Sequence, residues 1–113
     1  MHEIGALTKA LDLVERIALE NGAQKVKSIT LEVGELTGFL PVFFEKYFPV
    51  CVADRPVLKS AELRIQIVKG QALCTQCQTL YNIMRHEGKC PNCQSREKTV
   101  LGGQDFMVKD IGI

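Results

Sequence analysis

The chain has 113 residues, of which 46% are hydrophobic and 24% charged, and its formal net charge at pH 7 is +1. This length suits one compact domain, or a small domain that carries a smaller insert, and the balanced charge argues against disorder and against an electrostatic nucleic-acid binder. The apolar runs are shorter than the roughly 20 residues that cross a bilayer, and the N-terminus lacks the regions of a signal peptide. We therefore expect a cytoplasmic protein with neither a membrane nor a nucleic-acid partner.

Residues 4–20 have the spacing of an amphipathic helix, and Asn21-Gly22 directly after them is typical of a helix C-terminus. The apolar residues that recur at steps of three and four are Ile4, Leu7, Leu11, Val14 and Ala18. Residues 25–35 alternate as a strand with one buried face should. In this strand Ile29, Leu31 and Val33 should face the core, and Thr30 and Glu32 should face solvent.

A second helix is expected around Pro41, which suits a first helical turn, with Pro49 kinking or ending it. Its stripe consists of Phe44, Tyr47, Phe48 and Cys51. A further strand alternates through Leu63, Ile65 and Ile67, and the tail from residue 105 is strand-like. The pattern predicts an α+β fold, a small three-stranded sheet with two helices, interrupted by an inserted four-cysteine module that resembles a zinc ribbon.

The insert contains Cys74, Cys77, Cys90 and Cys93 in the spacing C-x2-C-x12-C-x2-C. Two residues between paired cysteines allow one tight turn to aim both sulfurs at the same ion, so we expect structural Zn(II). Rubredoxin-like iron and a redox dithiol are the alternatives, although Gln78 and Gln94 occupy places where many such knuckles carry glycine. A closed set of four cysteines leaves no open position for catalysis.

Glycines bracket the insert and are expected to act as hinges: Gly70, Gly102 and Gly103. The predicted domains are accordingly an α+β domain at residues 1–69 and 103–113 and a zinc-binding domain at residues 70–102. The insert has four basic and two acidic residues and only Tyr81 as an aromatic, which favours solvated charges over a nucleic-acid surface. Cys51 lies outside the motif and is expected to be a small buried hydrophobe.

The start of the chain, Met1-His2-Glu3, offers a second set of metal ligands. A free amine of Met1, the amide nitrogen of His2 and the His2 imidazole can chelate one ion in a plane, a geometry that Ni(II) and Cu(II) favour. The fourth planar place stays open for transfer of the ion. Glu3 adds a carboxylate near the positive end of the first helix. By itself, a terminal His-Glu pair is more often solvated sequence than a ligand set.

Taken together, these segments resemble the HypA/HybF family, whose members help to insert nickel into [NiFe] hydrogenases. The resemblance covers the whole chain and rests on Met1-His2-Glu3, the helix ending at Asn21-Gly22, the segments at residues 32–36 and 61–65, and the four cysteines. It implies a metallochaperone with Ni(II) as cargo at His2 and a separate structural zinc at the four cysteines. It also implies partnership with the accessory GTPase of the pathway and delivery to the hydrogenase large subunit, and a homodimer is compatible with it.

The chain departs from some relatives in that Leu40 stands about where they have an acidic residue, and no histidine follows Cys93. The fourth nickel ligand is therefore open. His86, between the two knuckles, could be recruited, although an exposed loop histidine is the simpler interpretation.

Two other classes of protein compete with this interpretation. One is a zinc-ribbon interaction module without a nickel function, in which the Met-His-Glu start is accidental. The other is an iron-containing electron carrier. An enzyme is the weakest alternative, because the sequence has no evident carboxylate pair, nucleophile–base set or phosphate-binding loop.

Overall fold

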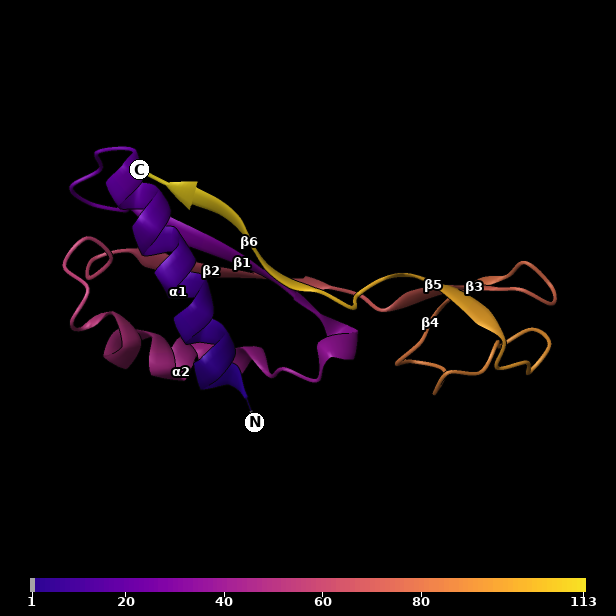
Figure 1. The fold of residues 1–113 in the computed structure, drawn as a ribbon. Helices are drawn as coiled ribbons and strands as arrows, with labels where there is room; N and C mark the ends of the chain where they lie inside the picture. Colours follow the sequence, from indigo (N-terminus) through magenta and orange to yellow (C-terminus); the bar gives the residue numbers. More distant parts are fainter. Residues whose placement is uncertain (1) are drawn as a thin grey trace. The chain divides into compact units, whose positions relative to one another are not determined.

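The computed structural model describes residues 2–113. Over these residues it contains two α-helices, one short 3-10 helix and six strands. In chain order they are α1 (Glu3–Glu20), β1 (Ser28–Gly34), η1 (Glu35–Thr37), α2 (Pro41–Val52), β2 (Glu62–Val68), β3 (Gln71–Cys74), β4 (Leu80–Asn82), β5 (Lys98–Gly102) and β6 (Phe106–Gly112). The strands form two three-stranded sheets (Figure 1), which confirms the predicted α+β class. Neither helix within the described residues combines the length and apolar character needed to cross a membrane.

The chain divides by its contacts into two compact units. Unit 1 contains the residues up to Glu32, together with Phe39–Gln66 and Met107–Ile113. Unit 2 contains Val33–Gly38 and Ile67–Phe106, and so holds the whole four-cysteine segment. The end of β1 and the η1 turn thus belong to unit 2 although they lie far upstream of the cysteines. The assignment of nickel to one domain and zinc to the other remains a prediction.

Helix α1 forms where the apolar spacing predicts it and ends at Glu20, directly before Asn21 and Gly22 as expected; Gly22 adopts a positive φ of 69°. Its buried positions include Leu7, Leu11, Val14 and Ala18. The first turn differs from the prediction, because Ile4 is 50% exposed whereas Glu3 is 3% exposed. Glu3 precedes Leu7 by four positions and therefore lies on the same face of α1, so it extends the buried stripe by one turn.

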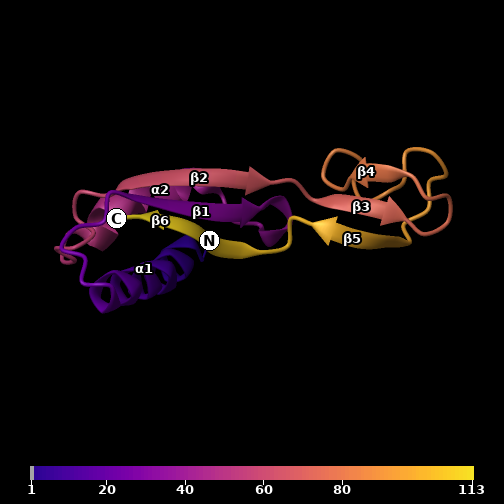
Figure 2. The ribbon, with the colours of Figure 1, turned by 90° about the horizontal axis from the view of Figure 1, so that it is seen from above.

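The first sheet has the order β2-β1-β6 (Figure 2), and β1 occupies the centre. Ile29, Leu31 and Val33 are buried as predicted. The prediction that Thr30 faces solvent is wrong, because its exposed fraction is only 4%. A central strand has a paired strand on either side, and the neighbouring side chains leave little of either face open. On the edge strand β2, Ile67 is 50% exposed, contrary to expectation.

Helix α2 begins at Pro41, as predicted, and packs against α1. Pro49 does not end the helix, which continues to Val52. The buried residues of α2 are Phe44, Phe48 and Val52. Tyr47 and Cys51, which were predicted on the same stripe, are only half-buried.

The second sheet lies within unit 2 and has the order β4-β3-β5, visible in Figure 2. Strand β3 pairs antiparallel with both neighbours, Leu73 lying opposite Leu80 on one side and Thr99 on the other. These strands have three to five residues. The sequence analysis did not resolve them inside the insert, because such short runs show too few alternations to be recognised.

The glycines that flank the insert lie close to other backbone atoms. A side-chain carbon added at Gly103, whose φ is +90°, would come within 2.6 Å of the Gly70 Cα atom. A carbon added at Gly70 would come within 2.7 Å of the Leu36 side chain. Two backbone segments therefore approach each other closely at these positions. The expectation that these glycines act as hinges stays a prediction.

Candidate functional site

The four cysteines of the motif converge within unit 2. Their Sγ atoms all lie within 4.8 Å of one another. The Cys74–Cys93 and Cys77–Cys90 sulfur pairs are each 3.5 Å apart. Four sulfurs placed at the usual distance of about 2.3 Å from a tetrahedral zinc ion would be about 3.8 Å apart. The donor set therefore fits a tetrahedral ion that has no further open position.

The two cysteine knuckles have the same backbone hydrogen bonds. The Gln78 N–H donates to the Cys74 carbonyl, and the Gln94 N–H donates to the Cys90 carbonyl, each at 2.9 Å. Both glutamines adopt positive φ angles, 66° and 68°. A side chain in this left-handed conformation costs on the order of 1 kcal/mol. The sharp turn that aims both sulfurs inward is therefore kept even without the glycine that many knuckles use.

Side chains beside the cysteines adjust the acidity of the thiols. Hydrogen bonds from the Asn92 side chain and from Thr79, whose hydroxyl lies 3.1 Å from the Cys77 sulfur, lower the pKa of Cys77 to about 6. The Ser95 N–H lowers the pKa of Cys93, but burial and the neighbouring thiols raise it overall to about 12. Such opposite shifts are expected where four thiols are too close to ionise together without a cation. Thr79 and Asn92 were not identified from the sequence, since nothing but proximity to the knuckles marks them.

The apolar core around the cysteines is small. Its fully packed members are Ala72, Cys74, Tyr81 and Cys90. Two of the four are metal-ligand candidates themselves, so metal binding must supply much of the folding free energy of this part of the chain. Tyr81 is 4% exposed, and its hydroxyl donates to the Gly88 carbonyl at 3.3 Å. A buried tyrosine offers no face for stacking of nucleotide bases.

The N-terminal candidates belong to unit 1 and differ from each other in their surroundings. The side chain of His2 is exposed at the N-terminus of α1, and its carbonyl accepts from the Ala6 N–H at 3.1 Å. Glu3 is buried, and its Oε2 atom accepts from the Leu40 N–H at 2.9 Å. Met1 lies outside the described residues. His2 is thus open to a ligand, whereas Glu3 ties the start of α1 to the start of α2.

The interaction of Glu3 with Leu40 was not predicted. Leu40 stood out in the sequence only as a departure from the family resemblance. Its backbone N–H meets the Glu3 carboxylate, while the Leu40 side chain stays exposed. No local sequence pattern shows this contact, because 37 positions separate the two residues.

His86 belongs to unit 2, as do the cysteines. Its ring meets that of Tyr81 edge-on, with ring centres 6.2 Å apart and an angle of 73° between the planes. The side chain is half-buried, so the expectation of an exposed loop histidine is wrong. Packing against a tyrosine accounts for His86 without a metal.

Comparison with known proteins identifies the family. A family model described as hydrogenase/urease nickel incorporation, metallochaperone, hypA, matches residues 1–113. A hydrogenase maturation factor HypA of Francisella philomiragia subsp. philomiragia is 35% identical, over 98% of this chain and 97% of that protein. A hydrogenase maturation factor HybF of Klebsiella pneumoniae is 31% identical, again over 98% and 97% of the two chains.

The fold is also similar to a solved one. The solution structure of the Ni metallochaperone HypA from Helicobacter pylori matches with a TM-score of 0.70 at 23% identity, over 100% of this chain and 97% of that chain. Together with the four-cysteine cluster and the whole-length family match, these similarities confirm the resemblance seen in the sequence. The chain belongs to the HypA family of hydrogenase and urease nickel-incorporation metallochaperones.

Proposed function

We propose that this chain carries Ni(II) at its N-terminus, through the Met1 amine, the His2 amide nitrogen and the His2 imidazole, and delivers it during maturation of a [NiFe] hydrogenase. The observation that carries the proposal is the exposed His2 side chain, directly before the anchored Glu3. Because Glu3 fixes the first turn of α1, His2 is presented from a rigid element and not from a free strand of chain. Three nitrogens in a plane suit Ni(II) and leave one position through which the ion can be transferred.

Glu3 is a further candidate for a nickel ligand, and its contacts favour a supporting role. One of its carboxylate oxygens already accepts the Leu40 N–H. The carboxylate still places a negative charge beside the positive end of α1, which reduces the repulsion that the helix dipole exerts on a bound cation. Glu3 therefore contributes to nickel binding through charge and position in this proposal.

We infer that the ion at Cys74, Cys77, Cys90 and Cys93 is structural Zn(II). The fit of the four sulfurs to a tetrahedron supports this identity, and so does the closed donor set. Iron in a four-cysteine site is coloured and redox-active, whereas zinc is neither. Metal analysis should find about one zinc per chain in a colourless protein, and stoichiometric iron would contradict the proposal.

The proposed partners follow from the family to which the chain belongs. They are the accessory GTPase of the maturation pathway and the hydrogenase large subunit, and the chain can act as a homodimer. Transport of an ion requires no catalytic step, so we propose that the chain is not an enzyme. None of the five cysteines, which all lie within the described residues, forms a disulfide, which agrees with action in the reducing cytoplasm.

The experiment that tests this function is a calorimetric nickel titration of the zinc-loaded protein that begins at Met1. His2→Ala should weaken nickel binding by at least a hundredfold, since it removes one of three ligands, and should leave the zinc content unchanged. His86→Ala is the matched control, because it removes the other of the two histidines, which belongs to unit 2. It should change nickel affinity less than threefold. Unchanged nickel binding by His2→Ala would contradict the proposal and favour a zinc-ribbon interaction module without a nickel function.

A further inference from the structure

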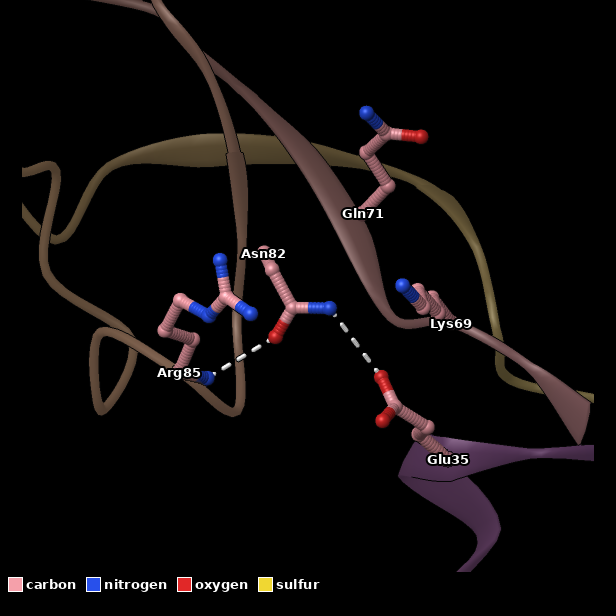
Figure 3. Close-up of a pocket in the computed structure, with 5 residues that line it drawn as sticks. All are labelled: Glu35, Lys69, Gln71, Asn82 and Arg85. Carbon is pink, nitrogen blue, oxygen red and sulfur yellow. Dashed lines mark hydrogen bonds between the residues drawn. The ribbon is translucent and has the colours of Figure 1, made fainter.

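Unit 2 contains a polar cavity away from the cysteine cluster. Its volume is about 520 Å³, and the residues that line it are Glu35, Lys69, Gln71, Asn82 and Arg85 (Figure 3). Glu35 belongs to η1, Lys69 lies between β2 and β3, and Gln71 is the first residue of β3. Asn82 ends β4, and Arg85 lies in the turn after it. None of them belongs to the nickel or zinc ligand sets discussed above. The cavity therefore needs an explanation of its own.

One wall of the cavity is held in place by a chain of hydrogen bonds. The Glu35 Oε1 atom accepts from the Gly70 N–H at 2.8 Å and from the Asn82 side-chain amide at 3.2 Å. The Asn82 side-chain oxygen in turn accepts from the Arg85 N–H at 2.8 Å. The Gly70 N–H, the Asn82 amide and the charge of Lys69 lower the pKa of Glu35, so this carboxylate is ionised at neutral pH. The wall is preorganised and carries one fixed negative charge.

The two cations of the cavity make no close polar contact with their side-chain ends within residues 2–113. Neither the Lys69 ammonium nor the Arg85 guanidinium has a hydrogen bond or a salt bridge there, although the charge of Lys69 acts on Glu35 from a greater distance. The bond of Arg85 to this wall is through its backbone N–H. In Figure 3 the ends of the two side chains flank Asn82. Cations without a close ion pair at a concave surface attract an anion, and the amide of Gln71 adds a neutral donor beside them.

The charge and size of the cavity narrow the class of anion. Lys69 and Arg85 against Glu35 leave a net charge of +1, which matches a monoanionic carboxylate better than a dianionic phosphate. None of the described residues that line the cavity has an aromatic side chain on which a nucleobase could stack. A volume of about 520 Å³ is larger than one carboxylic acid needs and suits a few residues of peptide.

We propose that this cavity is a docking site for an acidic segment of a partner protein, with one carboxylate bound between Lys69 and Arg85. Arg85 supplies the planar donor fork that suits a carboxylate, and Lys69 supplies the second charge. Gln71 donates to the main chain of the bound segment. Glu35 orients Asn82 and disfavours anions of higher charge. The site is independent of the proposed nickel ligands, so its failure would leave the nickel proposal untouched.

The test is fluorescence anisotropy of a labelled peptide of alternating glutamate and glycine, titrated with the zinc-loaded full chain. The peptide should bind saturably, and a counterpart with glutamine in place of glutamate should not. The double variant Lys69→Gln/Arg85→Gln should bind at least about fivefold more weakly, because it loses both charges that hold the carboxylate. The control double variant Lys25→Gln/Lys89→Gln removes the same charge at exposed positions outside the cavity and should change affinity less than twofold.

Inorganic phosphate serves as the competitor that separates the two anion classes. On the wild type it should displace the acidic peptide no more than sodium chloride of equal ionic strength does. The variant Glu35→Gln raises the local charge to +2, and its amide oxygen can still accept the Gly70 N–H. From this variant, phosphate should displace the peptide more strongly than sodium chloride of equal ionic strength does. Equal losses in the two double variants, absence of saturable peptide binding, or specific displacement by phosphate from the wild type would each overturn the proposal.

Discussion

Replacing Cys90 with alanine removes one of the four sulfurs of the proposed zinc site in unit 2. Structural zinc sites of this kind are worth about 10–16 kcal/mol at pH 7, so one ligand in four accounts for about 3 kcal/mol. Zinc affinity should therefore fall by about a hundredfold or more. Among the described residues, the core around the site consists, apart from cysteines, of the buried Ala72 and Tyr81, with Ile83 partly buried against them. Without zinc the pairing of β3 with β4 and β5 should therefore be lost.

Unit 1 should remain folded in the same variant, because its core includes fully buried residues of both helices and of β1. The assay is competition for zinc with a chromophoric chelator, together with amide NMR spectra of both units. Cys51→Ala is the matched control, since Cys51 is a free cysteine on α2 outside the cluster, and it should keep the zinc affinity of the wild type. Undiminished zinc affinity of Cys90→Ala would refute the ligand assignment, and collapse of both units together would refute the independence of unit 1.

Two backbone positions give further predictions, both measured by calorimetric unfolding of the zinc-loaded protein. Gly103→Ala should destabilise unit 2 by at least about 2 kcal/mol, because φ is +90° and the new carbon would meet the backbone of Gly70 at 2.6 Å. Gly102→Ala, with nothing within 4 Å, should change stability far less, and equal effects would contradict the close approach. Gln78→Gly should stabilise the first knuckle by about 0.5–1 kcal/mol, because it relieves the positive φ of 66°. Gln104→Gly, at an exposed position without positive φ, should not stabilise, and a gain there of the same size would argue against backbone strain at Gln78.

The features that the sequence predicted well are those encoded by spacing along the chain. Cysteines at 74, 77, 90 and 93 restrict each pair to a single turn, and their sulfurs do converge. The repeats of three and four in α1 and of two in β1 likewise placed most of the core correctly, because each depends only on the geometry of one element. The same reasoning placed Pro41 at the start of α2.

The features that were missed depend on contacts between distant parts of the chain. Spacing alone placed Ile4 rather than Glu3 on the buried side of α1, because the partner of Glu3 is the backbone of Leu40. The half-burial of His86 follows from its contact with Tyr81. Glu35 joins unit 2 by bonding to Asn82, 47 positions away. None of these contacts has a local pattern by which it could be recognised.

The central claim is that nickel binds at the chain start through the Met1 amine and His2. The most direct measurement is a nickel titration of the zinc-loaded protein that begins at Met1, compared with the same protein acetylated at the Met1 amine. Acetylation removes the amine as a nickel ligand without altering any side chain. The account predicts that nickel affinity falls at least tenfold on acetylation while zinc content stays the same. Nickel binding of equal strength by the two proteins would contradict it and would require a site built from side chains alone.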